Sequence, residues 1–247
     1  MAAVKSSEQL RGGALAYAAA LLTVAIGACV EERPSDGPTP IERMLAQDSA
    51  LEATAGDSAN RHISFDYENL NRVVWQKPDL LVERLGDLTG KTVVEVGAGT
   101  GFFTRRLARR AGRVIALDID PEMLLLLDSL NAAQLGAEAY ARVDPRRVPP
   151  DDPGLADGEG DAALVVNTFM YIRDRADYLR RLARGLSPGS TVVIVDFKQK
   201  STPVGPPVAA RLSLHEVETA LREAGLVGIR SDDTTLDYQY IVVARVP

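Results

Sequence analysis

The stretch TVVEVGAGTG at residues 92–101 decides the fold. Its first five residues form a short, mostly β-branched run, which predicts a buried strand. Three glycines then alternate with other residues, and a helical pattern follows over 102–110. Glycine permits a tight turn and lets a ligand approach the backbone without interference from a Cβ. The stretch therefore predicts a strand, a ligand-binding loop and a helix in succession.

Strand-like and helix-like segments continue to alternate along the rest of the chain. This alternation is typical of a doubly wound α/β fold with a mostly parallel sheet. Ligands of such sheets bind at the carboxyl ends of the strands, near the point where the strand order reverses. We expect strands at 92–96, 114–117, 139–143, 161–166, 191–195, 227–230 and 240–244, and helices at 102–110, 121–130, 176–186 and 213–224.

Two acidic residues flank the glycine loop in the expected order. Glu95 stands two positions before the first glycine, where it would repel a pyrophosphate and favour an ammonium group. The glycine spacing is also G-x-G-x-G, not the G-x-G-x-x-G of dinucleotide enzymes. Asp118 ends the next strand, about 20 residues on, where a carboxylate can accept hydrogen bonds from ribose hydroxyls. Asp120 then precedes Pro121 as a helix N-cap.

With these features, residues 66–244 resemble the class I S-adenosylmethionine-dependent methyltransferases, of the small-molecule type that includes ubiquinone- and menaquinone-biosynthesis-like enzymes. The resemblance implies a Rossmann-like, seven-stranded sheet whose last strand is antiparallel. It also implies S-adenosylmethionine as cofactor and methyl transfer to a small molecule. The cofactor contacts that it implies are Glu95, Gly97, Ala98, Gly99, Thr100, Gly101, Asp118, Ile119, Asp152 and Asn167.

The resemblance leaves several roles open. Asp152 is the expected contact to the adenine, with Asp144 as the alternative, and Asn167 and Tyr171 are candidates to face the methyl acceptor. Relatives tend to carry an aromatic residue and two histidines after the Asn-Thr pair. Here the run is FMY at 169–171, which removes a candidate base. A non-catalytic domain that binds a nucleoside or a protein partner is therefore the second hypothesis, and an NAD-dependent oxidoreductase is a weaker third.

Two further segments are similar to a subgroup of this family whose substrate the resemblance does not specify. The first is WQKP at residues 75–78. The second combines DFK at 196–198 with PVGPP at 203–207.

Composition excludes several other classes of function. The chain of 247 residues has 28 Lys and Arg against 34 Asp and Glu, a net charge of −6, so a general nucleic-acid-binding surface is not expected. One cysteine excludes a disulfide framework. Two distant histidines, His62 and His215, give little material for a metal site, and we expect none. Oligomeric state cannot be inferred from these features.

The N-terminal 60 residues have a different character. Residues 12–30 carry no charge and follow Lys5 and Arg11, the arrangement of a secretory signal. The segment ends in a lipobox-like sequence at Cys29, which predicts a lipoprotein; an uncleaved anchor is the alternative. We expect a signal or anchor at 1–29, a disordered linker at 30–60 and the methyltransferase-like domain at 61–247. The charge arrangement favours an exported, membrane-tethered domain over one on the cytoplasmic face.

Overall fold

The structure, a computed structural model, describes residues 72–247. The expectations for 1–29 and 30–60 lie outside this range. Among the residues from Arg72 onward, no helix is long and apolar enough to cross a membrane. The apolar segment 12–30 is not part of that range.

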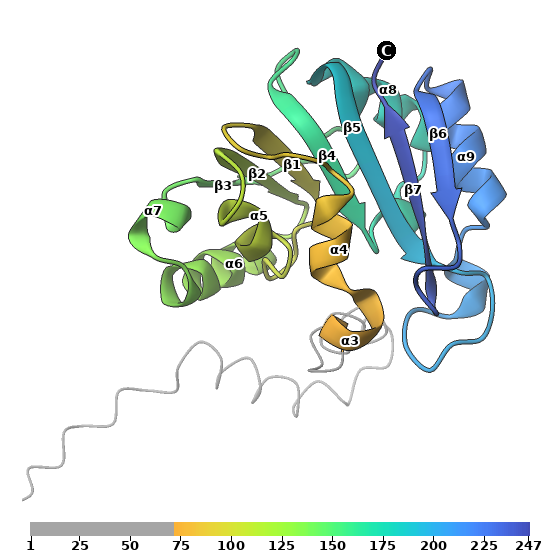
Figure 1. The fold of residues 1–247 in the computed structure, drawn as a ribbon, viewed down its shortest axis with the longest axis horizontal. Helices are drawn as coiled ribbons and strands as arrows, with labels where there is room; N and C mark the ends of the chain where they lie inside the picture. Colours follow the sequence, from red (N-terminus) through yellow and green to blue (C-terminus); the bar gives the residue numbers. More distant parts are fainter. Residues whose placement is uncertain (1–71) are drawn as a thin grey trace, which may run out of the picture. The chain divides into compact units, whose positions relative to one another are not determined.

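Helices and strands alternate through the described residues, as the sequence predicts (Figure 1). Their order is α3 (Arg72–Gln76), α4 (Pro78–Glu83), β1 (Thr92–Val96), α5 (Thr104–Ala108), β2 (Arg113–Asp118), α6 (Pro121–Gln134), α7 (Ala137–Tyr140), β3 (Val143–Arg147), β4 (Gly160–Val166), η1 (Phe169–Tyr171), α8 (Arg175–Arg184), β5 (Leu186–Phe197), η2 (Val208–Ala210), α9 (Leu214–Glu223), β6 (Val227–Asp232) and β7 (Gln239–Arg245).

The seven strands form one sheet in the order β3-β2-β1-β4-β5-β7-β6. The first five strands in this order are parallel, and β7 is antiparallel to both of its neighbours. The predicted fold class, a mostly parallel seven-stranded sheet with an antiparallel last strand, is therefore confirmed. The strand order reverses direction at β1, which lies between β2 and β4.

Each face of the sheet is covered by its own set of helices. Alternate residues of a strand point to opposite faces, so Val94 and Val96 of β1 join the core beneath α8 and α9. Val93 joins the core beneath α4 and α5 on the other face. By the same alternation Glu95 lies on the α5 side, which explains how a carboxylate can end up buried beside a helix.

The third strand is the one element that the prediction misplaced. A strand was expected at 139–143, but residues Ala137–Tyr140 form helix α7 and the strand is Val143–Arg147. The real strand has the sequence VDPRR, which lacks an apolar run and contains Pro145. Proline is tolerated there because β3 is at the edge of the sheet. Its composition therefore gives no strand signal.

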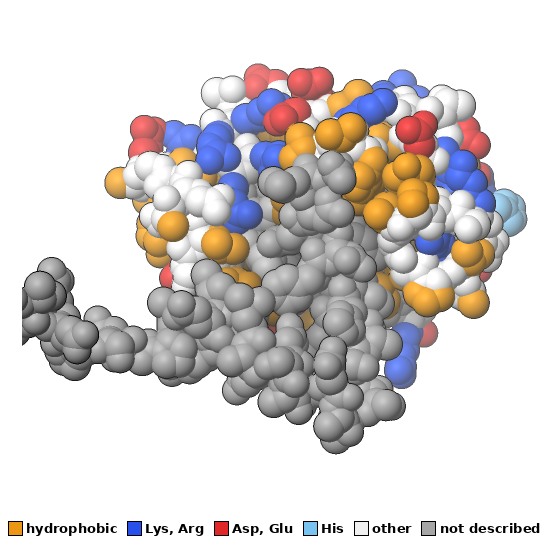
Figure 2. All heavy atoms as spheres, turned by 90° about the horizontal axis from the view of Figure 1, so that it is seen from below, with side chains coloured by type: hydrophobic (Ala, Val, Ile, Leu, Met, Phe, Trp, Pro, Cys, Tyr) orange, Lys and Arg blue, Asp and Glu red, His pale blue; other side chains and the backbone are white. Residues whose placement is uncertain are grey.

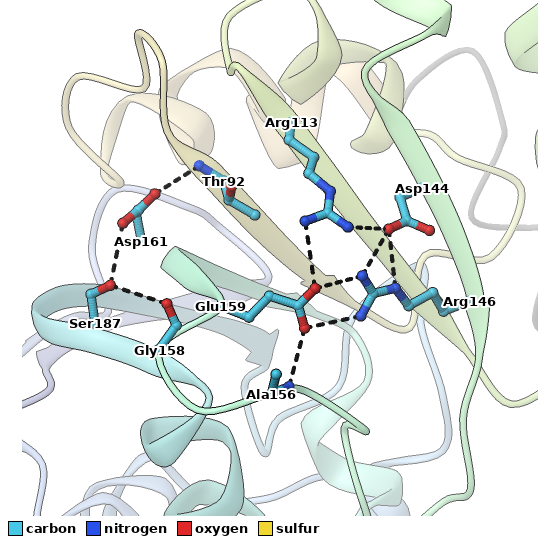
Figure 3. Close-up of polar contacts among 9 residues, drawn as sticks. All are labelled: Thr92, Arg113, Asp144, Arg146, Ala156, Gly158, Glu159, Asp161 and Ser187. Carbon is cyan, nitrogen blue, oxygen red and sulfur yellow. Dashed lines mark hydrogen bonds and ion pairs between the residues drawn. The ribbon is translucent and has the colours of Figure 1, made fainter.

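Ion pairs join this edge strand to its neighbours in addition to the packing of Val143 (Figure 3). The Arg146 guanidinium contacts Asp144 at 2.8 Å and Glu159, just before β4, at 2.6 Å. Arg113, at the start of β2, contacts Asp144 at 2.6 Å and Glu159 at 3.5 Å. Each exposed pair of this kind contributes less than about 1 kcal/mol, but here four groups act together. The network lies at the amino ends of the strands.

Candidate active site

A cavity of about 430 Å³ opens at the carboxyl ends of β1, β2 and β4, where the strand order reverses. Figure 2 views this edge of the domain, where hydrophobic and Lys or Arg side chains both reach the surface. The structure brings together nine of the predicted site residues in the cavity wall: Glu95, Gly97, Ala98, Gly99, Thr100, Asp118, Ile119, Asn167 and Tyr171.

Glu95 is buried between the sheet and α5. Thr104 Oγ1 donates a hydrogen bond to Glu95 Oε2 at 2.5 Å. Burial raises the pKa of Glu95 to about 8, although the Thr104 hydrogen bond and the nearby charges of Arg105 and Arg72 oppose the rise. Near pH 7 this carboxyl group is therefore mostly protonated, and a cation placed in the cavity would favour its ionised form.

Asp118 joins the glycine loop to the start of α6. Its Oδ2 accepts from the backbone N–H of Gly99 at 2.7 Å, and its Oδ1 accepts from Asp120 N–H at 3.0 Å. Burial raises the pKa of Asp118, while these two hydrogen bonds lower it. Asp120 caps α6 by accepting from Glu122 N–H, as predicted. Each carboxylate oxygen of Asp118 keeps capacity for a further donor, such as a ligand hydroxyl.

Two glycines of the loop are required for different reasons. Gly97 has φ +73°, and a Cβ there would lie 2.2 Å from Thr168 Oγ1, so this glycine allows the loop to pack on the chain after β4. Gly99 has φ +53°, and a Cβ there would meet nothing within 4 Å. Because Gly99 lines the cavity, that open space is available to a ligand.

Asn167 and Tyr171 lie on the wall formed by the chain after β4. Asn167 adopts a left-handed conformation with φ +58°, and its backbone N–H donates to Val195 O at 2.9 Å. Tyr171 is about half exposed. Between them, Phe169 and Met170 are buried in the core. A single side chain of the FMY run therefore reaches the cavity.

Three predicted residues do not line the cavity. Gly101 lies behind the loop, where a Cβ would come within 3.0 Å of Leu127. Asp144 belongs to the ion-pair network at the amino ends of the strands. The Oδ1 of Asp152 accepts from Gly154 N–H at 2.8 Å. Asp152 stands two residues after Pro150, which lines the cavity.

Sequence reasoning missed the part of the wall that follows β3. Val148, Pro149 and Pro150 line the cavity directly after this strand. Had the strand been placed at Val143–Arg147, the rule that ligands bind at carboxyl ends would have indicated these residues. Arg72, Phe102 and other lining residues carry no pattern that marks them as site residues. The other lining residues that were missed are Arg72, Phe102, Phe103, Asp120, Met123, Val148, Pro149, Pro150, Ile172 and Tyr178, with Val96, Leu117 and Val166 from the strands.

Comparisons with known proteins agree with this geometry. Residues 94–194 match a family model described as a methyltransferase domain. Demethylmenaquinone methyltransferase from Tropheryma whipplei is 30% identical over 154 residues, which cover 62% of this chain and 59% of that protein. Ubiquinone biosynthesis O-methyltransferase from Sodalis glossinidius is 26% identical over 186 residues, 72% of each chain. The chain thus spans less than two thirds of the length of the first of these relatives.

A solved structure has the same fold. The S-adenosylmethionine-dependent methyltransferase from Aquifex aeolicus superposes with a TM-score of 0.66 at 24% identity, over 74% of this chain and 97% of that one. Residues 94–194 are thus similar to a methyltransferase domain, and the sheet has the fold of the S-adenosylmethionine-dependent methyltransferase from Aquifex aeolicus.

Proposed function

We propose that this chain, whose methyltransferase domain has S-adenosylmethionine as its cofactor, transfers the cofactor's methyl group to a small molecule. One observation carries the proposal. Two buried carboxylates, Glu95 and Asp118, lie on either side of a glycine loop in a single cavity at the strand-order reversal. These two hydrogen-bond acceptors suit a ligand with an ammonium group at one end and ribose hydroxyls in its middle.

The described residues fit the cofactor. Glu95 would bind its ammonium group, because burial raises the pKa of Glu95 to about 8 despite the nearby charges of Arg105 and Arg72, and a further cation in the cavity would stabilise the ionised carboxylate. Asp118 would accept from the ribose hydroxyls through the lone pairs that Gly99 and Asp120 leave open. Gly99 leaves open space beside the loop. Asp152 remains the predicted adenine contact, and it stands two residues after Pro150, which lines the cavity.

The chemistry needs little from the protein besides alignment. When bound, the cofactor supplies a methyl group on a positively charged sulfur. The cavity wall holds the two reactants in line, and such positioning lowers the barrier by as much as about 7–11 kcal/mol. Asn167 and Tyr171 would orient the methyl acceptor, because they lie on the wall formed by the chain after β4.

Transfer of labelled methyl groups tests this proposal. The full chain is incubated with methyl-tritiated S-adenosylmethionine and a small-molecule extract of the source cells, and the label in the organic phase is counted. We expect label to appear there and to fall at least tenfold with Asp118→Ala. The exposed change Glu122→Gln is the matched control and should leave transfer unchanged. Absence of transfer by a chain that binds the cofactor would refute catalysis.

That negative outcome would favour the second candidate, a non-catalytic domain of methyltransferase fold. Its supporting observation is that Met170, which is buried in the core, and Tyr171 occupy the two positions where relatives tend to carry histidine, so neither position supplies a histidine to the cavity. Such a domain would bind a nucleoside ligand and transfer nothing.

We also propose that lipid at Cys29 tethers the domain to a membrane on the exported side. The support is the uncharged run 12–30 behind Lys5 and Arg11, with a Pro-containing tether after it. Fusion of a phosphatase or a green fluorescent protein after Pro247 tests the side of the membrane. An active phosphatase and a dark fluorescent fusion are expected. The opposite result would place the domain on the cytoplasmic face, where the cofactor is made.

A further inference from the structure

Four polar side chains from three distant parts of the chain form a row of hydrogen bonds beside the cavity. Arg72 Nε donates to Gln76 Oε1 at 2.6 Å, both on α3. Gln76 Nε2 donates to Gln239 Oε1, at the start of β7, at 2.9 Å. Gln239 Nε2 in turn donates to Asn167 Oδ1, after β4. Figure 1 shows α3 near the end of the sheet where β7 begins.

The direction of this row is fixed by its first member. A guanidinium can only donate hydrogen bonds, so the oxygen of Gln76 must face Arg72. The Gln76 amide nitrogen then faces the Gln239 oxygen, and the Gln239 amide nitrogen faces the Asn167 oxygen. Both glutamines are fully buried, so reversal of either amide would place like groups against each other without water to compensate.

The row ends at Asn167, a residue in the wall of the cavity. With its oxygen held by Gln239, Asn167 has its amide group Nδ2 left over, and this buried atom has no hydrogen-bond partner. Asn167 itself lines the cavity. Buried donors without a partner are rare in proteins, and one in a ligand cavity is explained by an acceptor on the ligand.

We propose that Arg72, Gln76 and Gln239 are positioning residues that present Asn167 Nδ2 as a hydrogen-bond donor to the methyl acceptor. The acceptor molecule would then carry a lone pair facing Asn167, as in a carbonyl, carboxylate or phenolate oxygen. An ammonium or other pure donor would be disfavoured at this position. This inference rests on the proposed function, because it concerns the same cavity.

The WQKP segment gains a role from this arrangement. Gln76 supplies the second link of the row. Trp75 packs on Phe197, with ring centroids 5.8 Å apart, and on Tyr238, the neighbour of Gln239, at 6.0 Å. Trp75 therefore fixes α3 against the start of β7, which keeps Gln76 and Gln239 in register.

Gln76→Glu reverses the row and so tests the proposal. Both oxygens of the new carboxylate accept, one from Arg72 and the other from the Gln239 amide nitrogen. The Gln239 oxygen then accepts from Asn167 Nδ2, and the Asn167 oxygen becomes the group left over at the cavity. Gln76→Met is the matched control, since its side chain has the same length and breaks the row without reversing it. Gln239→Glu reverses the end of the row by the same logic and serves if Gln76→Glu fails to fold.

The first readout is the side-chain NH₂ signal of Asn167 in ¹H–¹⁵N spectra of the full chain. We expect one Asn167 proton to shift downfield in Gln76→Glu, where it donates to Gln239, and not in Gln76→Met. An Asn167 signal that is the same in the wild type and in a folded reversing variant would overturn the proposal. This readout needs no ligand.

The second readout is selectivity between two neutral ligands of equal size, acetophenone, which accepts hydrogen bonds, and indole, which donates them. Both are titrated in the presence of saturating S-adenosylhomocysteine. The wild type should bind acetophenone about tenfold more tightly than indole, as one hydrogen bond predicts, and Gln76→Glu should reverse the preference. If the ratio of acetophenone to indole affinity is the same in the wild type and in Gln76→Glu, this inference is wrong, while the proposed function is not affected. Failure of the wild type to bind S-adenosylhomocysteine would instead overturn the proposed function, while the NH₂ signal still decides the direction of the row.

Discussion

The pKa of Glu95 gives the sharpest prediction, which concerns the pH dependence of cofactor binding. Burial raises this pKa to about 8, so the carboxyl group is protonated at lower pH. An ammonium group binds the ionised form, so below pH 8 each pH unit should cost about tenfold in affinity. For S-adenosylhomocysteine, the dissociation constant of the wild type should fall by about fiftyfold from pH 6 to pH 8, because only half of the carboxyl groups are ionised at pH 8.

Glu95→Gln removes the titrating group and keeps its shape. Its dissociation constant should be nearly the same at pH 6 and pH 8. At pH 8 it should bind about tenfold to a hundredfold more weakly than the wild type, which corresponds to the loss of about 1.5–3 kcal/mol for a hydrogen bond to a charged group. Glu122→Gln, on the exposed first turn of α6, is the control and should follow the wild type.

Isothermal titration calorimetry at pH 7 provides the assay. Titrations in phosphate and in Tris, which differ in ionisation enthalpy, give the number of protons exchanged on binding. The wild type should release nearly one proton, because Glu95 is mostly protonated before binding and ionised after it. Glu95→Gln should release close to none. Equal proton release by the two proteins, or a wild-type affinity that does not change between pH 6 and pH 8, would refute the assignment of Glu95 to the ammonium group.

Three further changes test other parts of the account. Asp118→Ala should weaken S-adenosylhomocysteine binding about tenfold to a hundredfold in the same titration, because a hydrogen bond to a charged group worth about 1.5–3 kcal/mol is lost. Equal affinity of the wild type and the variant would show that Asp118 does not contact the ligand. Gly99→Val should fold, at a cost of about 1–2 kcal/mol for its left-handed backbone, but it should not bind S-adenosylhomocysteine. Gly97→Val should instead unfold at a lower temperature than the wild type, because its side chain meets Thr168. Normal binding by Gly99→Val would show that the loop is only a structural turn. Burial raises the pKa of Asp196 to about 8, so this side chain keeps its proton in the folded state up to about that pH. The same side chain loses its proton above about pH 4 in the unfolded chain. The free energy of unfolding should therefore decrease as the pH rises from 4 to 8. Asp196→Asn should reduce that slope in urea titrations, and an unchanged slope would contradict the burial argument.

The local parts of the site could be predicted because their signals are short in sequence. The strand, the glycine loop and Asp118 lie within 92–118, and the direct bond between Gly99 and Asp118 spans 19 residues. Glycine conformation and the alternation of strand faces decide this region with little help from distant residues. The cap at Asp120 is equally local and was predicted.

The missing parts depend on contacts between distant segments. Strand β3 is held at the sheet edge by ion pairs with Arg113 and Glu159, so its sequence shows no apolar pattern. The bond between Gln76 and Gln239 joins residues 163 positions apart, and no periodicity reports such a contact.

Titration of the full chain with S-adenosylhomocysteine and, separately, with NADH tests the central claim most directly. Both ligands carry an adenosine moiety, but only the first has the ammonium group that Glu95 would bind, whereas the second has a pyrophosphate, which offers Glu95 no cation. The account predicts micromolar binding of S-adenosylhomocysteine and no measurable binding of NADH. Binding of NADH without binding of S-adenosylhomocysteine would contradict it.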